Sequence, residues 1–340
     1  MYTRGLLATL AVGLLLSAQL PAVAGSAFPY HLVRRIALPG TGPVHALLFD
    51  PRTREIYAAQ GRRIAVFSLA GAPLAVRRPL AGTVSALARN GAGEIIAAVR
   101  SPAQLVFLSA RTLTVEHRRA LRAGPPAALL YDRSANMLFV ESRSSGSIER
   151  VDPRSGQLLG RVRLDSALGQ MAGNGRGTLY VANAARDALE VIDAGAMRDA
   201  GSIALHRCPG PGALAMDTIG RRLFVGCASG RALIVDADLG FTFVRLPIAG
   251  GSKLQAAFAF HPWGAHGWKG GAFFAGSTAV SAIQMQAFVR YRDHGQLLLP
   301  TPCTALALAA PVGELWLALA PPSGGRAVLW VLGVDRSEVK

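Results

Sequence analysis

Lysine, acidic residues and cysteine are all scarce in this sequence of 340 residues. Only three of its 36 basic residues are lysine, and its 20 acidic residues leave a formal net charge of +16. Charged residues make up 16% of the chain and hydrophobic residues 51%, which excludes an intrinsically disordered chain because so much apolar surface can be buried. The positive charge has two explanations at this stage: an acidic partner, or a general use of arginine for surface cations.

Several familiar catalytic and metal-binding motifs are also absent. The chain has no His-Glu-x-x-His sequence, no P-loop and no Gly-x-Ser-x-Gly sequence. Its three cysteines form no Cys-x-x-Cys pair, which argues against zinc fingers and c-type haem attachment. No cofactor is therefore expected.

Long apolar runs are missing too, except for a short one near the amino end. Residues Gly5–Leu16 are apolar, follow a basic start, and precede Ala22-Val23-Ala24, a small-x-small cleavage pattern. The run is too short to cross a membrane, which needs about 20 residues, and no later apolar segment reaches 18. We predict that residues 1–24 are a bacterial signal peptide and that the mature chain is periplasmic or secreted, without a transmembrane segment.

Seven internal repeats dominate the remainder of the sequence. Each contains short apolar runs separated by turns rich in Asp, Gly or Asn, and the second run starts with a hydrophobic pair. These pairs are Ile56-Tyr57, Ile95-Ile96, Leu138-Phe139, Leu179-Tyr180, Leu223-Phe224, Phe273-Phe274 and Leu315-Trp316. Their average spacing of about 43 residues is typical of one four-stranded propeller blade.

The repeats predict an all-β fold, a seven-bladed β-propeller that occupies residues 25–340 as a single domain. A strand-like segment, His31–Leu38, precedes the first full repeat, while the last repeat has room for only three strands. We therefore expect an amino-terminal strand to complete the last blade, which would close the ring and remove exposed sheet edges.

The fourth repeat resembles a known bacterial family. Its sequence TLYVANAARDALEVIDAGAM (Thr178–Met197) is similar to the YVTN-type β-propeller repeat, in which "YVAN" ends one strand and "VID" ends the next. Arg221–Asp238 and Asn136–Pro153 match more loosely. The resemblance implies a seven-bladed propeller of the lactonase-like and surface-layer-like group, whose members include enzymes and binding proteins.

Arginine recurs in the turns between the second and third strands of six blades. A ring of guanidinium groups around one mouth of the propeller suits phosphate or carboxylate ligands. General arginine enrichment is the alternative, because the turns on the opposite face also carry arginines, including Arg52, Arg89 and Arg133. The predicted ligand-binding residues are Arg62, Arg100, Arg143, Arg186, Arg231 and Arg326.

The sixth repeat is the longest and contains a loop rich in histidine and tryptophan. We interpret this loop and a predicted turn at Arg290–Gly295 as a partner-contact or packing surface formed by His261, Trp263, His266, Trp268, Asp293 and His294. The less favoured alternative is a transition-metal site that uses His261, His266, Asp293 and His294 as ligands.

The cysteine positions predict one disulfide in the fifth blade. Cys208 lies in the link that enters this blade and Cys227 ends its second strand, so the two fall on the same face. An exported chain with three cysteines favours one disulfide and one free thiol, with two buried thiols at these positions as the alternative. Cys303 is interpreted as a small buried hydrophobe rather than a nucleophile.

These features favour a non-enzymatic binding or scaffold module that contacts an acidic protein or another polyanion through its loops, as a monomer or within a hetero-complex. Nucleic acid is a weakly supported partner, because the arginine-bearing turns lack aromatic residues for base stacking. The alternative is an enzyme, or an enzyme subunit, of the lactonase-like or quinoprotein-dehydrogenase-like type. His45 is one residue placed to face the channel of such an enzyme, but the predicted inner strands are almost entirely apolar or small.

Overall fold

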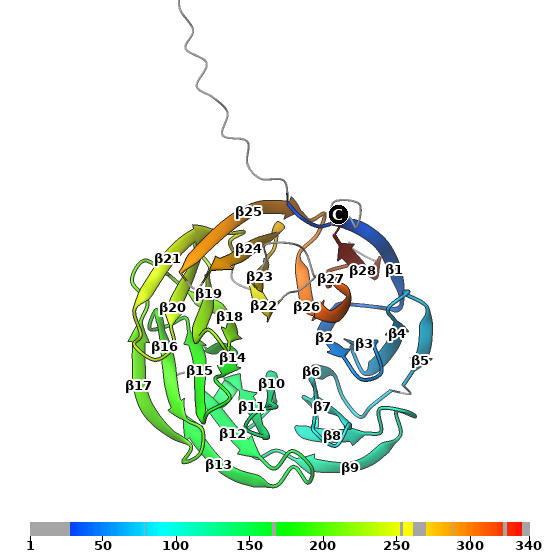
Figure 1. Cartoon of the computed structure of the whole chain (residues 1–340). Helices are drawn as coiled ribbons and strands as arrows, with labels where there is room; N and C mark the ends of the chain where they lie inside the picture. Colours follow the sequence, from blue (N-terminus) through cyan, green and yellow to red (C-terminus); the bar gives the residue numbers. More distant parts are fainter. Residues whose placement is uncertain are drawn as a thin grey trace, which may run out of the picture.

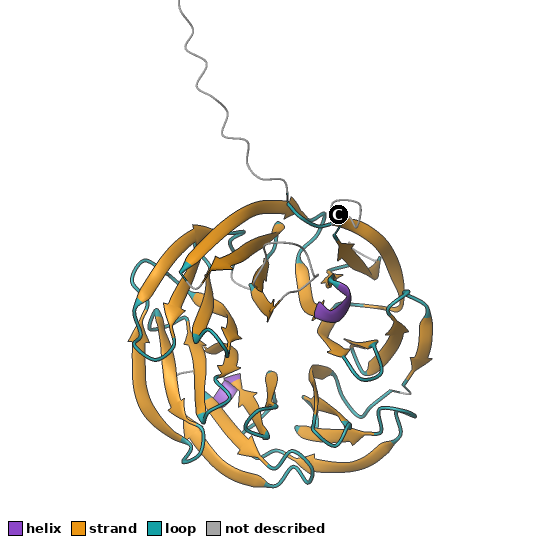
Figure 2. Ribbon diagram, viewed as in Figure 1, coloured by secondary structure: helices purple, strands orange, loops and turns teal. Residues whose placement is uncertain are grey.

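The computed structural model describes residues 28–334 except 78, 165–167, 252–253, 261–269, 288 and 322–324. Its strands form seven separate antiparallel sheets of four strands each, arranged in a ring around a central axis (Figure 1), and we call the region along this axis the channel. Regular structure is almost entirely β, with only two short 3-10 turns, η1 (Arg143–Ser145) and η2 (Ala310–Val312), in the described residues (Figure 2). The seven-bladed propeller predicted from the repeat length is confirmed.

In each of the first six blades the strands run in sequence order from the channel to the outer rim. Blade one contains β2 (Val44–Asp50), β3 (Glu55–Gln60), β4 (Arg63–Ser68) and β5 (Pro73–Val76), and blade two contains β6 (Val84–Arg89), β7 (Ile95–Val99), β8 (Gln104–Leu108) and β9 (Val115–Ala120). Blade three contains β10 (Ala128–Asp132), β11 (Met137–Ser142), β12 (Ser147–Val151) and β13 (Leu158–Arg163), and blade four contains β14 (Leu168–Gly173), β15 (Thr178–Asn183), β16 (Ala188–Asp193) and β17 (Arg198–Ala204). Blade five contains β18 (Pro211–Asp217), β19 (Arg222–Cys227), β20 (Arg231–Asp236) and β21 (Thr242–Pro247), and blade six contains β22 (Gln255–Phe260), β23 (Gly270–Ala275), β24 (Ala279–Ala287) and β25 (Arg290–Leu298).

Blade seven joins the two ends of the described chain. Its order is β26 (Cys303–Ala309), β27 (Glu314–Leu319), β28 (Arg326–Gly333) and β1 (His31–Thr41), with β1 as the outermost strand. The β1–β28 register pairs Leu32 with Leu332 and Ile36 with Leu329. Ring closure by an amino-terminal strand is therefore confirmed. Among the described residues, no helix has the length and apolar character needed to cross a membrane.

The hydrophobic core lies between the blades, as seven clusters that each join two neighbouring sheets. Successive side chains of a strand point to opposite faces of its sheet, so each blade contributes to two of these clusters. Phe273 packs against blade seven, whereas Phe274 packs against blade five. Both faces of the second and third strands are buried, which explains why these strands are mostly apolar rather than alternating.

Polar side chains join the inner strands across the channel. The Gln170 Oε1 atom accepts backbone N–H groups from Leu214 at 3.0 Å and Ala256 at 2.9 Å, so it connects the inner strands of blades four, five and six. Gln255 connects blade six to blade seven, because its Nε2 donates to the Thr304 carbonyl at 2.7 Å. Its Oε1 also accepts the Leu306 N–H at 3.1 Å. These side chains satisfy backbone groups that the sheets leave unpaired.

Candidate functional site

The turns of a four-stranded blade divide between two faces of the ring. We call the face with the turns between the second and third strands the ring face, and the opposite face, which carries the other turns within each blade, the cavity face. All six predicted ligand-binding arginines lie on the ring face and are exposed, in or directly beside the turns between second and third strands. The predicted placement is therefore confirmed, while their ligand-binding role stays a prediction.

Three of these six arginines have partners within the chain. Arg143 Nε lies 3.0 Å from Glu141 Oε1, and Arg186 Nη1 lies 3.2 Å from Glu190 Oε1. Both carboxylates are buried, and an unpaired buried charge is strongly destabilising. These two arginines therefore act as counter-ions that stabilise the fold. Arg62 Nε donates to the Leu80 carbonyl at 2.7 Å.

The other three, Arg100, Arg231 and Arg326, make no side-chain hydrogen bond or ion pair with any residue that the structure describes. Arg100 nevertheless lies close enough to His45 to affect it electrostatically. Burial, followed by the charge of Arg100, lowers the pKa of His45 and favours its neutral form. The ring face is thus positive, but its arginines do not act as one equivalent set.

The blade-six surface is only partly described. His261, Trp263, His266 and Trp268 lie outside the described residues, so the loop part of the predicted partner surface is untested. The predicted turn at residues 290–295 is wrong, because these residues belong to β25. Strands β24 and β25 have nine residues each, and Val289 lies in the turn that precedes β25.

Asp293 and His294 take part in the local structure of that strand. His294 Nε2 lies 2.7 Å from Gln284 Oε1 on β24, and Asp293 Oδ1 accepts the Gly295 N–H at 2.8 Å. Burial and the charge of Arg292 lower the pKa of His294. Within the described part of the chain, no group of three or more His, Cys, Asp or Glu side chains is placed to hold a metal ion.

The disulfide prediction is confirmed. Cys208 and Cys227 are bonded to each other, 19 positions apart in the sequence, and both are fully buried. Cys303 is free and buried, and burial raises the pKa of its thiol to about 12. A thiol with so high a pKa is protonated at neutral pH and a poor nucleophile, in agreement with the sequence interpretation.

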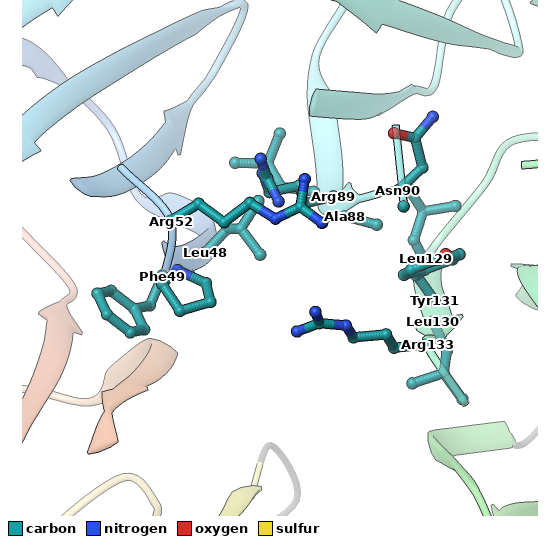
Figure 3. A pocket seen from close by; sticks show the side chains of 13 residues that line it. Leu48, Phe49, Arg52, Ala88, Arg89, Asn90, Leu129, Leu130, Tyr131 and Arg133 are labelled. Atoms are coloured by element: carbon teal, nitrogen blue, oxygen red, sulfur yellow. The ribbon is translucent and has the colours of Figure 1, made fainter. Parts of the chain in front are cut away.

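The opposite face contains a cavity that the sequence did not reveal. It has a volume of about 310 Å³ and lies at the mouth of the channel between blades one, two and three (Figure 3). Its polar lining includes Asn90, Tyr131 and three arginines that follow or end the inner strands: Arg52, Arg89 and Arg133. No acidic side chain among the described residues lines it.

Turn chemistry explains why arginines reach this mouth. Asp50 ends β2, and its Oδ1 accepts the Arg52 N–H at 2.9 Å. Asp132 ends β10 in the same way and caps the turn that contains Arg133, through the N–H of Ser134 at 3.0 Å. Such side-chain caps are typical of Asp at turns, and they fix the backbone of the turns that carry Arg52 and Arg133.

The three lining arginines differ in the contacts that their side chains make. Arg89 Nε lies 2.6 Å from Asp50 Oδ2, and Asp50 is fully buried, so this pair fixes Arg89 and neutralises it. Arg52 and Arg133 are exposed, and their side chains make no hydrogen bond or ion pair with any described residue. Figure 3 shows them extending from opposite sides toward the middle of the opening.

Gly93 allows two of these guanidinium groups to approach the same point. A Cβ atom at Gly93 would lie 3.1 Å from Arg89 Nη2 and 4.0 Å from Arg52 Nη1, and the φ angle of +100° at this position also favours glycine. Because Asp50 neutralises Arg89, the uncompensated positive charge among the lining arginines comes from Arg52 and Arg133. Uncompensated positive charge at a concave mouth favours a negatively charged group.

Comparison with known proteins agrees with the fold and does not establish a family or a function. No family model and no curated protein matches the chain. Similar solved structures include the RRP9 WD40 repeats, with a TM-score of 0.73 and 11% identity over 92% of this chain and 99% of the other. The chain therefore resembles this WD40-repeat structure in its fold. U3-55K gives a TM-score of 0.71 at 11% identity over 91% and 100% of the two chains. A chain of a mitotic checkpoint complex gives 0.72 at 15% identity over 97% and 99%. At these identities the likeness establishes this propeller fold alone.

Proposed function

We propose that this protein is an exported, non-enzymatic binding module that docks an acidic protein partner on its cavity face. The observation that carries the proposal is the convergence of Arg52, Arg89 and Arg133 on one cavity mouth without a lining carboxylate. Only Arg89 is neutralised from within, by Asp50. Two exposed guanidinium groups are thus available for an acidic surface, and each offers a planar pair of donors that matches a carboxylate.

The remaining features support a binding role. The formal charge of +16 would attract an acidic partner over a distance and speed its association, most strongly at low salt. One of the similar propellers belongs to a mitotic checkpoint complex, so the fold can serve within protein assemblies. Export is proposed from the leader-like residues 1–24 and from the YVTN-type resemblance, and amino-terminal sequencing of the mature protein would test it.

Binding of poly-L-glutamate to the mature chain tests the docking face. The double variant Arg52→Ala/Arg133→Ala should weaken binding about tenfold or more, because hydrogen bonds to charged groups contribute roughly 1.5–3 kcal/mol each. The matched control is Arg231→Ala/Arg326→Ala, which removes the same charge from two exposed ring-face arginines. Equal losses in both double variants would show that net charge, rather than the cavity face, determines binding.

A further inference from the structure

Apolar side chains also line the cavity, beside its three arginines. Its wall includes Leu48 from β2, Leu87 and Ala88 from β6, and Leu129 from β10. Leu87 and Ala88 are buried, while Leu48 and Leu129 are half-buried and face accessible space. A surface that only attracts acidic chains by charge does not need a recess with aliphatic walls. This combination instead matches the usual form of small-ligand sites, with an apolar lining and a few polar groups that fix orientation.

The size of the cavity limits the ligand. A volume of about 310 Å³ is at the lower end of the range for small-molecule sites. It equals the space taken by about ten water molecules in the liquid, so the occupant has about ten non-hydrogen atoms. A carboxylate uses three of these atoms, whereas a phosphate group uses five and leaves less of the space for an apolar body.

We infer that the cavity binds a small amphipathic carboxylate, with its head between Arg52 and Arg133 and its hydrocarbon body against Leu48 and Leu129. The inference rests on the proposed function, because the same arginines that dock an acidic partner hold this head. The ion pair between Arg89 and Asp50 forms the rigid back of the site. The ligand is either a free fatty-acid-like molecule or the carboxyl-terminal residue of a peptide, since both present a carboxylate beside an apolar group.

Calorimetric titration of the mature protein with acetate, butanoate, hexanoate and octanoate tests the apolar wall. Each added methylene that enters the cavity should tighten binding about threefold to fourfold, and the gain should stop once the space is full. Octanamide, which has the same body and no charge, should bind at least tenfold more weakly than octanoate. A short peptide ending in leucine and its carboxyl-terminal amide distinguish the two sources of the carboxylate.

Two variants separate this inference from the proposed function. Leu129→Ala removes part of the wall and should weaken octanoate several-fold, while poly-L-glutamate binds as before. Arg52→Ala/Arg133→Ala should weaken both ligands. Circular dichroism of each variant verifies that the propeller is folded.

The outcomes have distinct meanings. Alkanoates that bind with equal strength at every chain length, while poly-L-glutamate still requires Arg52 and Arg133, would overturn the small-ligand inference and leave the proposed function standing. If octanamide binds as tightly as octanoate, and the double arginine variant keeps the same dependence on alkanoate chain length, the cavity is an apolar site that does not bind the carboxylate. This result also overturns the inference. Octanoate binding that requires the arginines, with no poly-L-glutamate binding at all, would overturn the docking proposal alone.

Discussion

Replacement of Gln170 would show how strongly the channel side chains join the blades. One oxygen of this residue accepts two backbone N–H groups, from Leu214 on β18 and Ala256 on β22. Gln170→Met keeps the length of the side chain but removes the acceptor. An unsatisfied buried donor costs about 1–3 kcal/mol, and Ala256 is only half-buried, so the variant should lose about 2–4 kcal/mol of unfolding free energy.

Urea unfolding followed by tryptophan fluorescence measures this loss as a shift of the transition midpoint. Gln170→Glu is the control, because its carboxylate accepts the same two N–H groups and should retain most of the stability at neutral pH. The reasoning would be refuted by a methionine variant within about 0.5 kcal/mol of wild type, the range usual for neutral surface substitutions. It would also be refuted if glutamate and methionine were equally destabilising.

Three further predictions concern closure, the free thiol and a buried acid. The Leu38 side chain on β1 is 1% exposed, so Leu38→Ala should lower the free energy of unfolding in urea by about 2–5 kcal/mol. The control Leu74→Ala, at an exposed position of β5, should cost less than about 0.5 kcal/mol. Equal losses would contradict a core role for the closing strand. Burial raises the pKa of Cys303 to about 12, so its thiol should resist iodoacetamide at pH 8 in the folded protein and react in urea. Mass spectrometry measures the labelling, and rapid labelling of the folded chain would contradict this prediction. Burial raises the pKa of Glu141 above the ordinary 4.5 despite the opposing effect of Arg143, so the folded state binds this proton more tightly than the unfolded state and loses stability as pH rises above 4.5. Glu141→Gln should lack that decline, so the difference between the wild-type and variant stabilities should fall as pH rises across pH 4–7; a difference that does not change with pH would contradict the assignment.

The blades were predictable because their signal is local and repeated. Pairs such as Leu138-Phe139 lie in the second strand of each repeat, and packing on both sides of that strand favours apolar residues at most of its positions. The Cys208–Cys227 bond and the closing strand were also predictable, since both follow from counting strands along the repeats. The sequence analysis placed Asp293 in a turn, whereas it lies in β25. A long strand and a long turn are difficult to distinguish in a sequence that lacks clear turn signals.

The candidate site was less accessible to sequence reasoning. Arg52, Arg89 and Arg133 stand in three different repeats and read as scattered surface charge, and only the curvature of the ring brings them to one mouth. Conversely, the regular ring-face pattern looked functional. Arg143 and Arg186, however, neutralise buried glutamates that the sequence could not show to be buried.

The pairing of β1 with β28 also constrains the order of folding. The paired residues Leu32 and Leu332 are separated by 300 positions, so this contact carries the loop-closure entropy of nearly the whole domain. Neighbouring strands within a blade can associate as soon as they are available, but the ring can be sealed only after its seventh blade exists. Until that moment blade seven has three strands and an open edge along β28, the kind of edge that invites pairing with another chain. The return of β1 to β28 therefore removes an edge along which the unsealed chain is exposed to aggregation.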